Sequence, residues 1–196
     1  MALVPLIGPQ IEPISVTDLK AHLRIDSAAE DAVLASLIIT ARLQIEAALA
    51  LALITQSWSW TFDRWPRRAS VELPISPVQQ INSVLIFQSG GPVTMLPSAY
   101  ILDGHSIGAR LIARDNWPPP SVAALGIEIQ LVAGFGATPA EVPAAIRQAL
   151  LVLAAHWYNR RDADGGCSAP TAGAPTSGPL PPVVNDLLAP YRRSRL

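Results

Sequence analysis

The chain has 196 residues, of which 50% are hydrophobic and only 15% charged, with 14 basic against 15 acidic side chains. This length supports one domain, or one domain with an appendage, and it can bury a core without disulfides or a structural metal. The single cysteine, Cys167, excludes an intrachain disulfide framework and a CxxC zinc site. The net charge of −1 argues against the basic surface typical of proteins that grip nucleic acid.

The mean hydropathy of the chain is positive, so a membrane span has to be considered. The sequence contains no run of about 18 apolar residues, and its N-terminus lacks the basic region of a signal peptide. We therefore expect no transmembrane helix and a cytoplasmic protein. The low share of charged residues favours burial of apolar surface between subunits instead.

The N-terminal part predicts an arm followed by a short helix. Residues 1–15 contain three prolines and no periodicity, which is typical of an extended arm. Ser15 and Asp18 form a capping-box pattern ahead of an amphipathic segment that ends near Ile25.

A longer helix is predicted next. Ser27 and Glu30 form a second capping-box pattern, and apolar residues at helical spacing continue to about Leu53. This helix is apolar on more than one face, so it has to be covered on more than one side.

From Thr55 the period changes to two. Trp58, Trp60 and Phe62 alternate with small polar residues, which predicts a half-buried strand. Glycine and proline turns separate the further strand candidates, which are residues 70–73, 81–87, 93–96, 100–102, 110–113 and 127–135. Short strands at this spacing favour a small antiparallel sheet over βαβ units.

The C-terminal part predicts a helix, a tether and a docking segment. Thr138 with Glu141, or Pro143 at a first-turn position, begins a helix that ends near Arg160. Residues 162–182 are rich in Gly, Pro, Ser and Ala, which is typical of a flexible tether. The segment beyond it combines apolar and basic residues like a docking peptide, although folding back on its own domain is an equally good interpretation.

These elements predict an α+β, mainly helical fold. We expect a helical bundle, made of the N-terminal helix pair and the long C-terminal helix, with an inserted small antiparallel β-sheet. The expected boundaries are an arm at 1–15, a domain at 16–161 with its β insertion at about 55–135, a flexible tether at 162–182, and a C-terminal docking segment at 183–196.

Catalytic patterns are weak in this sequence. Gly134-Phe135-Gly136 stands between a strand and a helix, but the third glycine of a dinucleotide cradle is missing, so a plain turn is favoured. Asp103, His105 and Ser106 lie together in a segment of turn composition, which explains them more simply than a catalytic triad or a metal site. We expect no enzyme activity, no cofactor and no bound metal.

Aromatic and basic residues suggest core packing more than nucleic-acid binding. Trp58 and Trp60 are spaced for one sheet face, and Trp157 is in line with a helix core. The densest basic cluster inside the fold is Arg64, Arg67 and Arg68. It predicts a solvated loop, with a partner-facing loop as the alternative.

Six sequence blocks follow one another along the chain: VTDLKAHLRID (16–26), LITQSW (53–58), VAGFG (132–136), VPAAIRQA (142–149), AHWYNR (155–160) and LLAPYR (187–192). In this order they resemble the head-to-tail connector (adaptor) proteins of tailed phages and gene transfer agents. The resemblance implies a structural protein of a virion or phage-like particle, assembled in the host cytoplasm and located in the neck.

The resemblance also implies partners. The chain would form a homo-oligomeric ring, with a dodecamer as the expected state, beneath the portal protein, and a stopper or tail component would bind its opposite face. The ring would extend the DNA channel, and DNA would pass without sequence-specific binding; no membrane is involved. The alternatives are another neck component, such as a stopper or tail completion protein, and, less favoured, a small hydrolase or nucleotide-binding protein.

Two sets of residues acquire roles from the resemblance. The segment that would contact the portal contains Val184, Leu187, Leu188, Tyr191, Arg192 and Arg193. The subunit interface of the ring would use the multi-faced helix, through Leu37, Ile39, Leu43, Arg42 and Glu46.

Overall fold

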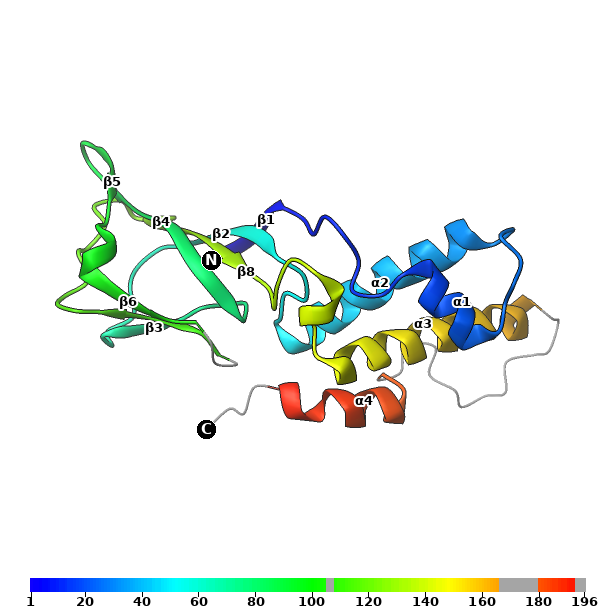
Figure 1. The fold of residues 1–196 in the computed structure, drawn as a ribbon. Helices are drawn as coiled ribbons and strands as arrows, with labels where there is room; N and C mark the ends of the chain where they lie inside the picture. The colour runs from blue at the N-terminus through cyan, green and yellow to red at the C-terminus, as the bar shows by residue number, and fades with distance from the viewer. Residues whose placement is uncertain (105–107, 166–179, 193–196) are drawn as a thin grey trace, which may run out of the picture.

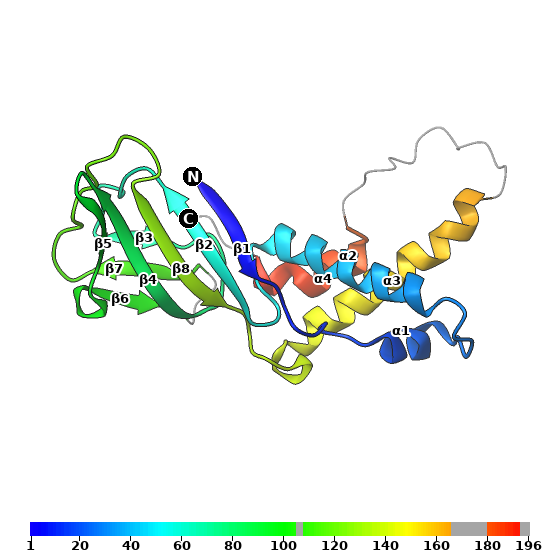
Figure 2. The same ribbon diagram turned by 90° about the horizontal axis from the view of Figure 1, so that it is seen from above.

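The computed structural model describes residues 1–104, 108–165 and 180–192. They form two lobes that lie end to end (Figures 1 and 2), one built of strands and the other of helices. Each lobe has its own hydrophobic core. The chain passes between the lobes three times, before the first helix, after the second helix and before the third.

The helical lobe is organised around α3 (Ala144–Gly165), which packs against α1 (Val16–Leu23), α2 (Asp31–Leu49) and α4 (Pro182–Leu188). The predicted start of α1 is confirmed. The Asp18 N–H donates to Ser15 Oγ at 3.0 Å, and the Ser15 N–H donates to the Asp18 carboxylate at 2.9 Å. Two orphan donors of the first turn are thereby satisfied.

The predicted limits of α2 are wrong at both ends. Ser27 Oγ accepts the N–H of Ala29 in a local turn, so the helix begins only at Asp31 and without a side-chain cap. Glu30 instead accepts a hydrogen bond from the Tyr158 hydroxyl of α3. The helix ends at Leu49, because the next residue adopts a left-handed conformation.

The β lobe consists of two antiparallel sheets that enclose one core. The five-stranded sheet has the order β1 (Ala2–Ile7), β2 (Gln56–Phe62), β8 (Ile127–Ala133), β4 (Val78–Gln88) and β5 (Gly91–Thr94). The three-stranded sheet has the order β3 (Ser70–Glu72), β7 (Arg110–Ala113) and β6 (Tyr100–Asp103).

The predicted strand is confirmed as β2, but its alternation is incomplete, since Trp58 is half-buried and Ser59 is buried. Trp60 and Phe62 are buried in the β-lobe core, and β2 pairs along its whole length with β8. Short 3₁₀ helices, η1 (Pro97–Ala99), η2 (Pro139–Glu141) and η3 (Ala189–Tyr191), complete the described elements. The capping box of Thr138 and Glu141 is present, but it caps η2, and α3 begins after Pro143.

The expectation of a mainly helical bundle is wrong. The chain is 35% helical and 29% strand, with four helices and eight strands in two antiparallel sheets in the described part. The arm predicted at residues 1–15 contains β1, which adds an edge strand to β2. Pro5 hides this strand in the sequence, but an edge position tolerates a residue without an N–H donor.

Helix α2 is long and apolar enough to cross a membrane by length and composition alone. The core helix of a soluble protein can have the same length and apolar composition. In the folded chain α2 packs against α1 and α3 and contributes Leu34, Ile38 and Ile45 to the helical core.

Candidate functional site

Arg42 and Glu46, predicted as interface residues, face the interior of the protomer. They are 6% and 8% exposed, and Arg42 Nη1 donates to Glu46 Oε2 at 2.9 Å. Arg42 Nε also donates to Glu12 at 2.8 Å, while Glu46 Oε1 accepts the Leu53 N–H at 2.9 Å and Gln56 Nε2 at 2.6 Å. This network, the junction network, joins the N-terminal arm, α2 and the start of β2 between the two lobes.

The surroundings of the junction network raise the pKa of both charged groups. Burial raises the pKa of the Glu46 carboxyl group, against the opposing effects of the Leu53 N–H and Arg42. Burial lowers the pKa of the Arg42 guanidinium, but the hydrogen bond from Arg42 to Glu12 and the Glu46 charge outweigh it, so the net shift is upward. Because these charges are satisfied within the protomer, Leu37, Ile39 and Leu43 remain as predicted interface residues at or near the surface.

The exposed side of α2 carries no charge and combines apolar residues with Ser36, Thr40 and Gln44. Ile39 is 42% and Leu43 54% exposed, and Leu37 is half-buried. Between residues 32 and 48 every exposed side chain of α2 is uncharged. A surface helix ordinarily carries charged residues on its solvent side. This face, the α2 face, therefore has the composition of a contact surface.

An apolar hollow adjoins the α2 face. It has a volume of about 430 Å³ and lies between the N-terminal arm and α2, where Ile11, Ile14, Ile38 and Ile39 line it. Ile11 and Ile39 are exposed at its rim. The arm and the helix thus present one continuous apolar surface.

The C-terminal segment folds back on its own lobe in the part that the structure describes. Val184 and Leu188 of α4 are fully buried in the helical core, and Leu187 packs against it. Tyr191 is half-buried, and Arg192 is exposed and donates to Asn185 Oδ1 at 2.8 Å. Arg193 lies outside the described residues. Contact of this segment with a portal protein stays a prediction.

The catalytic alternatives gain no support from the described residues. Asp103 forms an exposed ion pair with Arg110 at 2.7 Å, and His105 and Ser106 lie outside the described residues. No group of three or more metal-ligating side chains occurs within 1–104, 108–165 and 180–192.

The glycines of Gly134-Phe135-Gly136 have packing roles. Gly134 has a φ of +142°, and a Cβ atom there would lie 2.6 Å from the backbone nitrogen of Thr55. A Cβ atom at Gly136 would lie 2.1 Å from the Glu141 carboxyl carbon. Gly134 is therefore required for close backbone packing at the junction of the lobes, whereas Gly136 leaves room for the Glu141 side chain that caps η2.

One feature of the β lobe is not visible in the sequence. Trp65 and Trp117 stack with ring centroids 4.1 Å apart and an interplanar angle of 11°. Their loops carry the predicted basic cluster of Arg64, Arg67 and Arg68 and line a groove of about 850 Å³. Sequence periodicity could not find this pair, because both residues lie in loops separated by most of the β lobe.

Comparison with known proteins supports one family. Residues 13–86 match the family described as phage gp6-like head-tail connector protein. The whole chain is similar to chains in three solved structures, each at 25% identity and covering 100% of this chain and 97% of the other. They are the virion of a native gene transfer agent (GTA) particle (TM-score 0.80), the neck of an empty GTA particle computed with C6 symmetry (0.79) and the neck of a native GTA particle computed with C12 symmetry (0.77). No curated protein matches the chain. The predicted resemblance to head-to-tail connector proteins is confirmed, and the family match contains the first two of the six sequence blocks.

Proposed function

We propose, from the match of residues 13–86 to the phage gp6-like head-tail connector family, that this protein is a structural head-to-tail connector in the neck of a phage-like particle. The observation that carries this proposal is the full-length similarity to chains of GTA particles, with a TM-score of 0.80 for the native virion. The protein acts by forming interfaces rather than by catalysis. It joins the capsid to the tail.

The connector assembles as a homo-oligomeric ring. The similar neck structures have C6 and C12 symmetry, which supports a ring built from copies of one chain. The α2 face supplies the surface for a second copy, since an uncharged helix face with exposed Ile39 and Leu43 gains free energy when a neighbour covers it. The hollow between the arm and α2 would receive an apolar side chain from that neighbour.

The C-terminal segment provides the contact with the portal protein. Val184 and Leu188 anchor α4 to α3, so they position the segment rather than touch the partner. Tyr191 and Arg192, which lie nearer the surface, and the partly buried Leu187 are the contact residues in this proposal. DNA passes through the ring without sequence-specific binding, and a stopper or tail component binds the opposite end.

The ring is tested by exchanging one exposed apolar residue for a charge. We expect Leu43→Glu to abolish ring formation in negative-stain images and in sedimentation velocity, because each copy would place a carboxylate in an apolar contact. Leu96→Glu is the matched control, since Leu96 is exposed on the β lobe. Rings from Leu43→Glu, or loss of rings in both variants with folded protein, would contradict the assigned surface.

The portal contact is tested by cosedimentation with purified portal rings. We expect the wild-type chain to sediment with the portal, and Arg192→Glu to reduce the bound fraction because it reverses an exposed charge of the segment. Arg24→Glu, an exposed change on the same lobe, is the control. If the wild-type chain does not bind portal rings, the assignment to the portal-proximal position is wrong.

A further inference from the structure

The stacked tryptophans lie at the end of the β lobe that faces away from the helices. Strand β2 leaves the lobe junction at Gln56 and ends at Phe62, and β8 returns from Ile127 to Ala133. The loops beyond Phe62 and before Ile127 therefore meet at the distal end (Figure 2). We call the hollow between residues 63–69 and 115–123 the distal groove.

The distal groove is built from loops that are fixed to each other. Trp65 Nε1 donates to the Pro118 carbonyl at 3.0 Å, and Trp117 Nε1 donates to the Arg68 carbonyl at 3.2 Å. Each loop thus supplies a ring to the stack and a carbonyl to the other loop. Phe62 packs edge-on against Trp65 and connects the stack to the core. The two hydrogen bonds between the loops, together with the prolines in both loops, hold the groove in its shape before a ligand binds.

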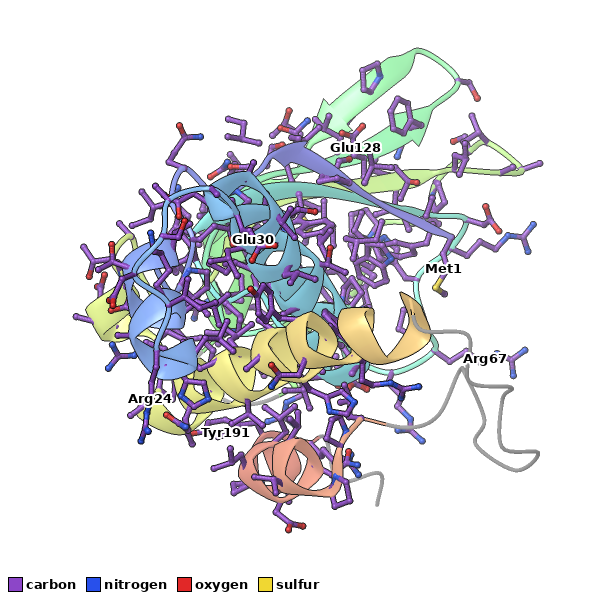
Figure 3. The ribbon with its side chains drawn as sticks, turned by 90° about the vertical axis from the view of Figure 1, so that its right-hand side faces the viewer. Met1, Arg24, Glu30, Arg67, Glu128 and Tyr191 are labelled. Atoms are coloured by element: carbon purple, nitrogen blue, oxygen red, sulfur yellow. The ribbon has the colours of Figure 1, made fainter. Side chains whose placement is uncertain are left out.

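Unpaired positive charge surrounds the distal groove. Arg64, Arg67 and Arg68 are exposed, as is Arg114 beside the second loop, and none of the four forms an ion pair with another described residue. Figure 3 shows Arg67 extending outward from the ribbon. Two carboxylates stand against these four arginines: Asp115, which is exposed and lines the groove, and Asp63, which already accepts the N–H of Leu125 at 2.9 Å. The groove therefore presents an excess of free guanidinium groups.

We propose that the distal groove binds an acidic segment of another protein of the neck, the component that adjoins the β-lobe end of the ring. This inference rests on the proposed connector function and names the chemistry of its second partner. Guanidinium groups pair bidentately with carboxylates, and tryptophan and arginine are enriched in protein contact surfaces. A volume of about 850 Å³ holds several residues of an extended chain.

The shape of the groove favours a peptide over DNA. A DNA duplex is convex and would touch the exposed arginines while leaving the half-buried Trp65 and Trp117 uncovered. A peptide with acidic residues and an apolar anchor contacts both the arginines and the tryptophans. The net charge of the whole chain, −1, gives little long-range attraction for either polyanion, so recognition of an acidic segment has to be local.

The binding test uses the full-length chain and two defined polyanions. Fluorescein-labelled poly-L-glutamate is titrated with protein at low salt, and its anisotropy is followed. We expect saturable binding that weakens at least tenfold in the double variant Arg67→Glu/Arg68→Glu, because the exchange removes two guanidinium donors and places two carboxylates against an acidic ligand. The matched control is Arg24→Glu/Arg160→Glu, which changes the net charge equally on the helical lobe and is expected to bind like the wild type.

Three results would overturn the groove proposal. They are an absence of saturable binding, an equal loss in the control variant, and stronger binding to a labelled DNA duplex of similar length with the same dependence on Arg67 and Arg68. The third result would assign the groove to DNA. Because this assay contains no portal protein, its failure is separate from a failure of the cosedimentation experiment, which tests the connector function.

The partner is identified in assembled particles. A photoreactive p-benzoylphenylalanine in place of Ala123, an exposed residue at the groove, is cross-linked in particles and the product is located by mass spectrometry. We expect a cross-link to an acidic stretch of a different neck protein. A cross-link to a second copy of this chain, or none in particles that contain the variant, would overturn the proposal.

Discussion

Removing the Glu46 side chain is expected to loosen the two lobes from each other. In Glu46→Ala, Arg42 keeps only its hydrogen bond to Glu12, and the Leu53 N–H and Gln56 Nε2 lose their acceptor. All of these groups meet at the lobe junction. The change therefore acts on the junction and leaves the two hydrophobic cores intact.

The expected loss follows from the burial of the network. Breaking a buried ion pair by deleting one partner lowers the free energy of unfolding by about 3–5 kcal/mol, and an orphaned buried donor accounts for about 1–3 kcal/mol. These figures overlap, because the orphaned donors are part of the same network, so we expect about 4 kcal/mol in total. Glu46→Gln keeps an acceptor oxygen but loses the charge, and we expect about half that loss.

Urea unfolding with two optical probes measures this effect. Four of the tryptophans, Trp58, Trp60, Trp65 and Trp117, belong to the β lobe, so fluorescence reports mainly on that lobe. Far-ultraviolet circular dichroism near the helical minimum reports on the helices. We expect coincident transitions in the wild type and separated transitions in Glu46→Ala, because the lobes then unfold independently.

A surface ion pair provides the control. Asp103→Ala removes the exposed pair with Arg110 and is expected to change the free energy of unfolding by less than about 1 kcal/mol. The reasoning would be refuted if Glu46→Ala lowered stability no more than Asp103→Ala and both probes still coincided. A double change to Arg42→Met and Glu46→Leu should recover only the part of the loss that comes from the unpaired Arg42 charge, since the Leu53 N–H and Gln56 Nε2 stay without their acceptor.

Two further outcomes are expected. Leu188→Ala should lower the free energy of unfolding by about 2–5 kcal/mol and speed proteolysis at the C-terminal segment, because Leu188 holds α4 in the core. The control Val183→Ala should do neither, since Val183 is exposed. Equal effects of the two changes would contradict the assignment of Leu188 to the core. The backbone N–H of Ser15 lowers the pKa of Asp18, so its stabilisation is present above the ordinary value of 3.8 and is lost as the pH falls through the folded value. Stability measured against pH should show a shallower acid decline in Asp18→Asn, and an unchanged slope would refute this reading.

Local patterns predicted the elements whose signals are local. The capping box of Ser15 and Asp18 begins α1, and the alternation around Trp60 forms β2. The capping-box pattern gave a wrong helix start at Ser27, because the Ser27 hydroxyl accepts the N–H of Ala29 in a turn and does not cap α2. Helix caps and turns favour the same residue types, so the sequence does not distinguish them here. The mainly helical expectation failed because α2 is shorter and β4 longer than predicted, and because β1 was missed. β1 pairs with a strand far away along the chain, and such pairing leaves little periodicity in an edge segment.

The candidate site was only partly accessible from sequence. Arg42 and Glu46 were predicted as subunit-interface residues, although they are the only charges within residues 32–49 of α2 and lie buried in the protomer. Their partners, Glu12, Leu53 and Gln56, come from three segments, so the sequence could not tell an internal network from a subunit contact. The exposure of Leu43 and the burial of Leu188 likewise depend on how the helices pack.

The three chain crossings between the lobes determine how the protomer carries load. Two lobes joined by one connecting segment can rotate about a few backbone torsion angles. Two lobes joined by three connecting segments can rotate only if all three segments deform together. The junction network and the close packing of Gly134 against Ile54 clamp these crossings further. We therefore expect the two lobes to move as one rigid body. A force on the distal end of the β lobe is then transmitted to α2 and α3 instead of bending the lobe junction.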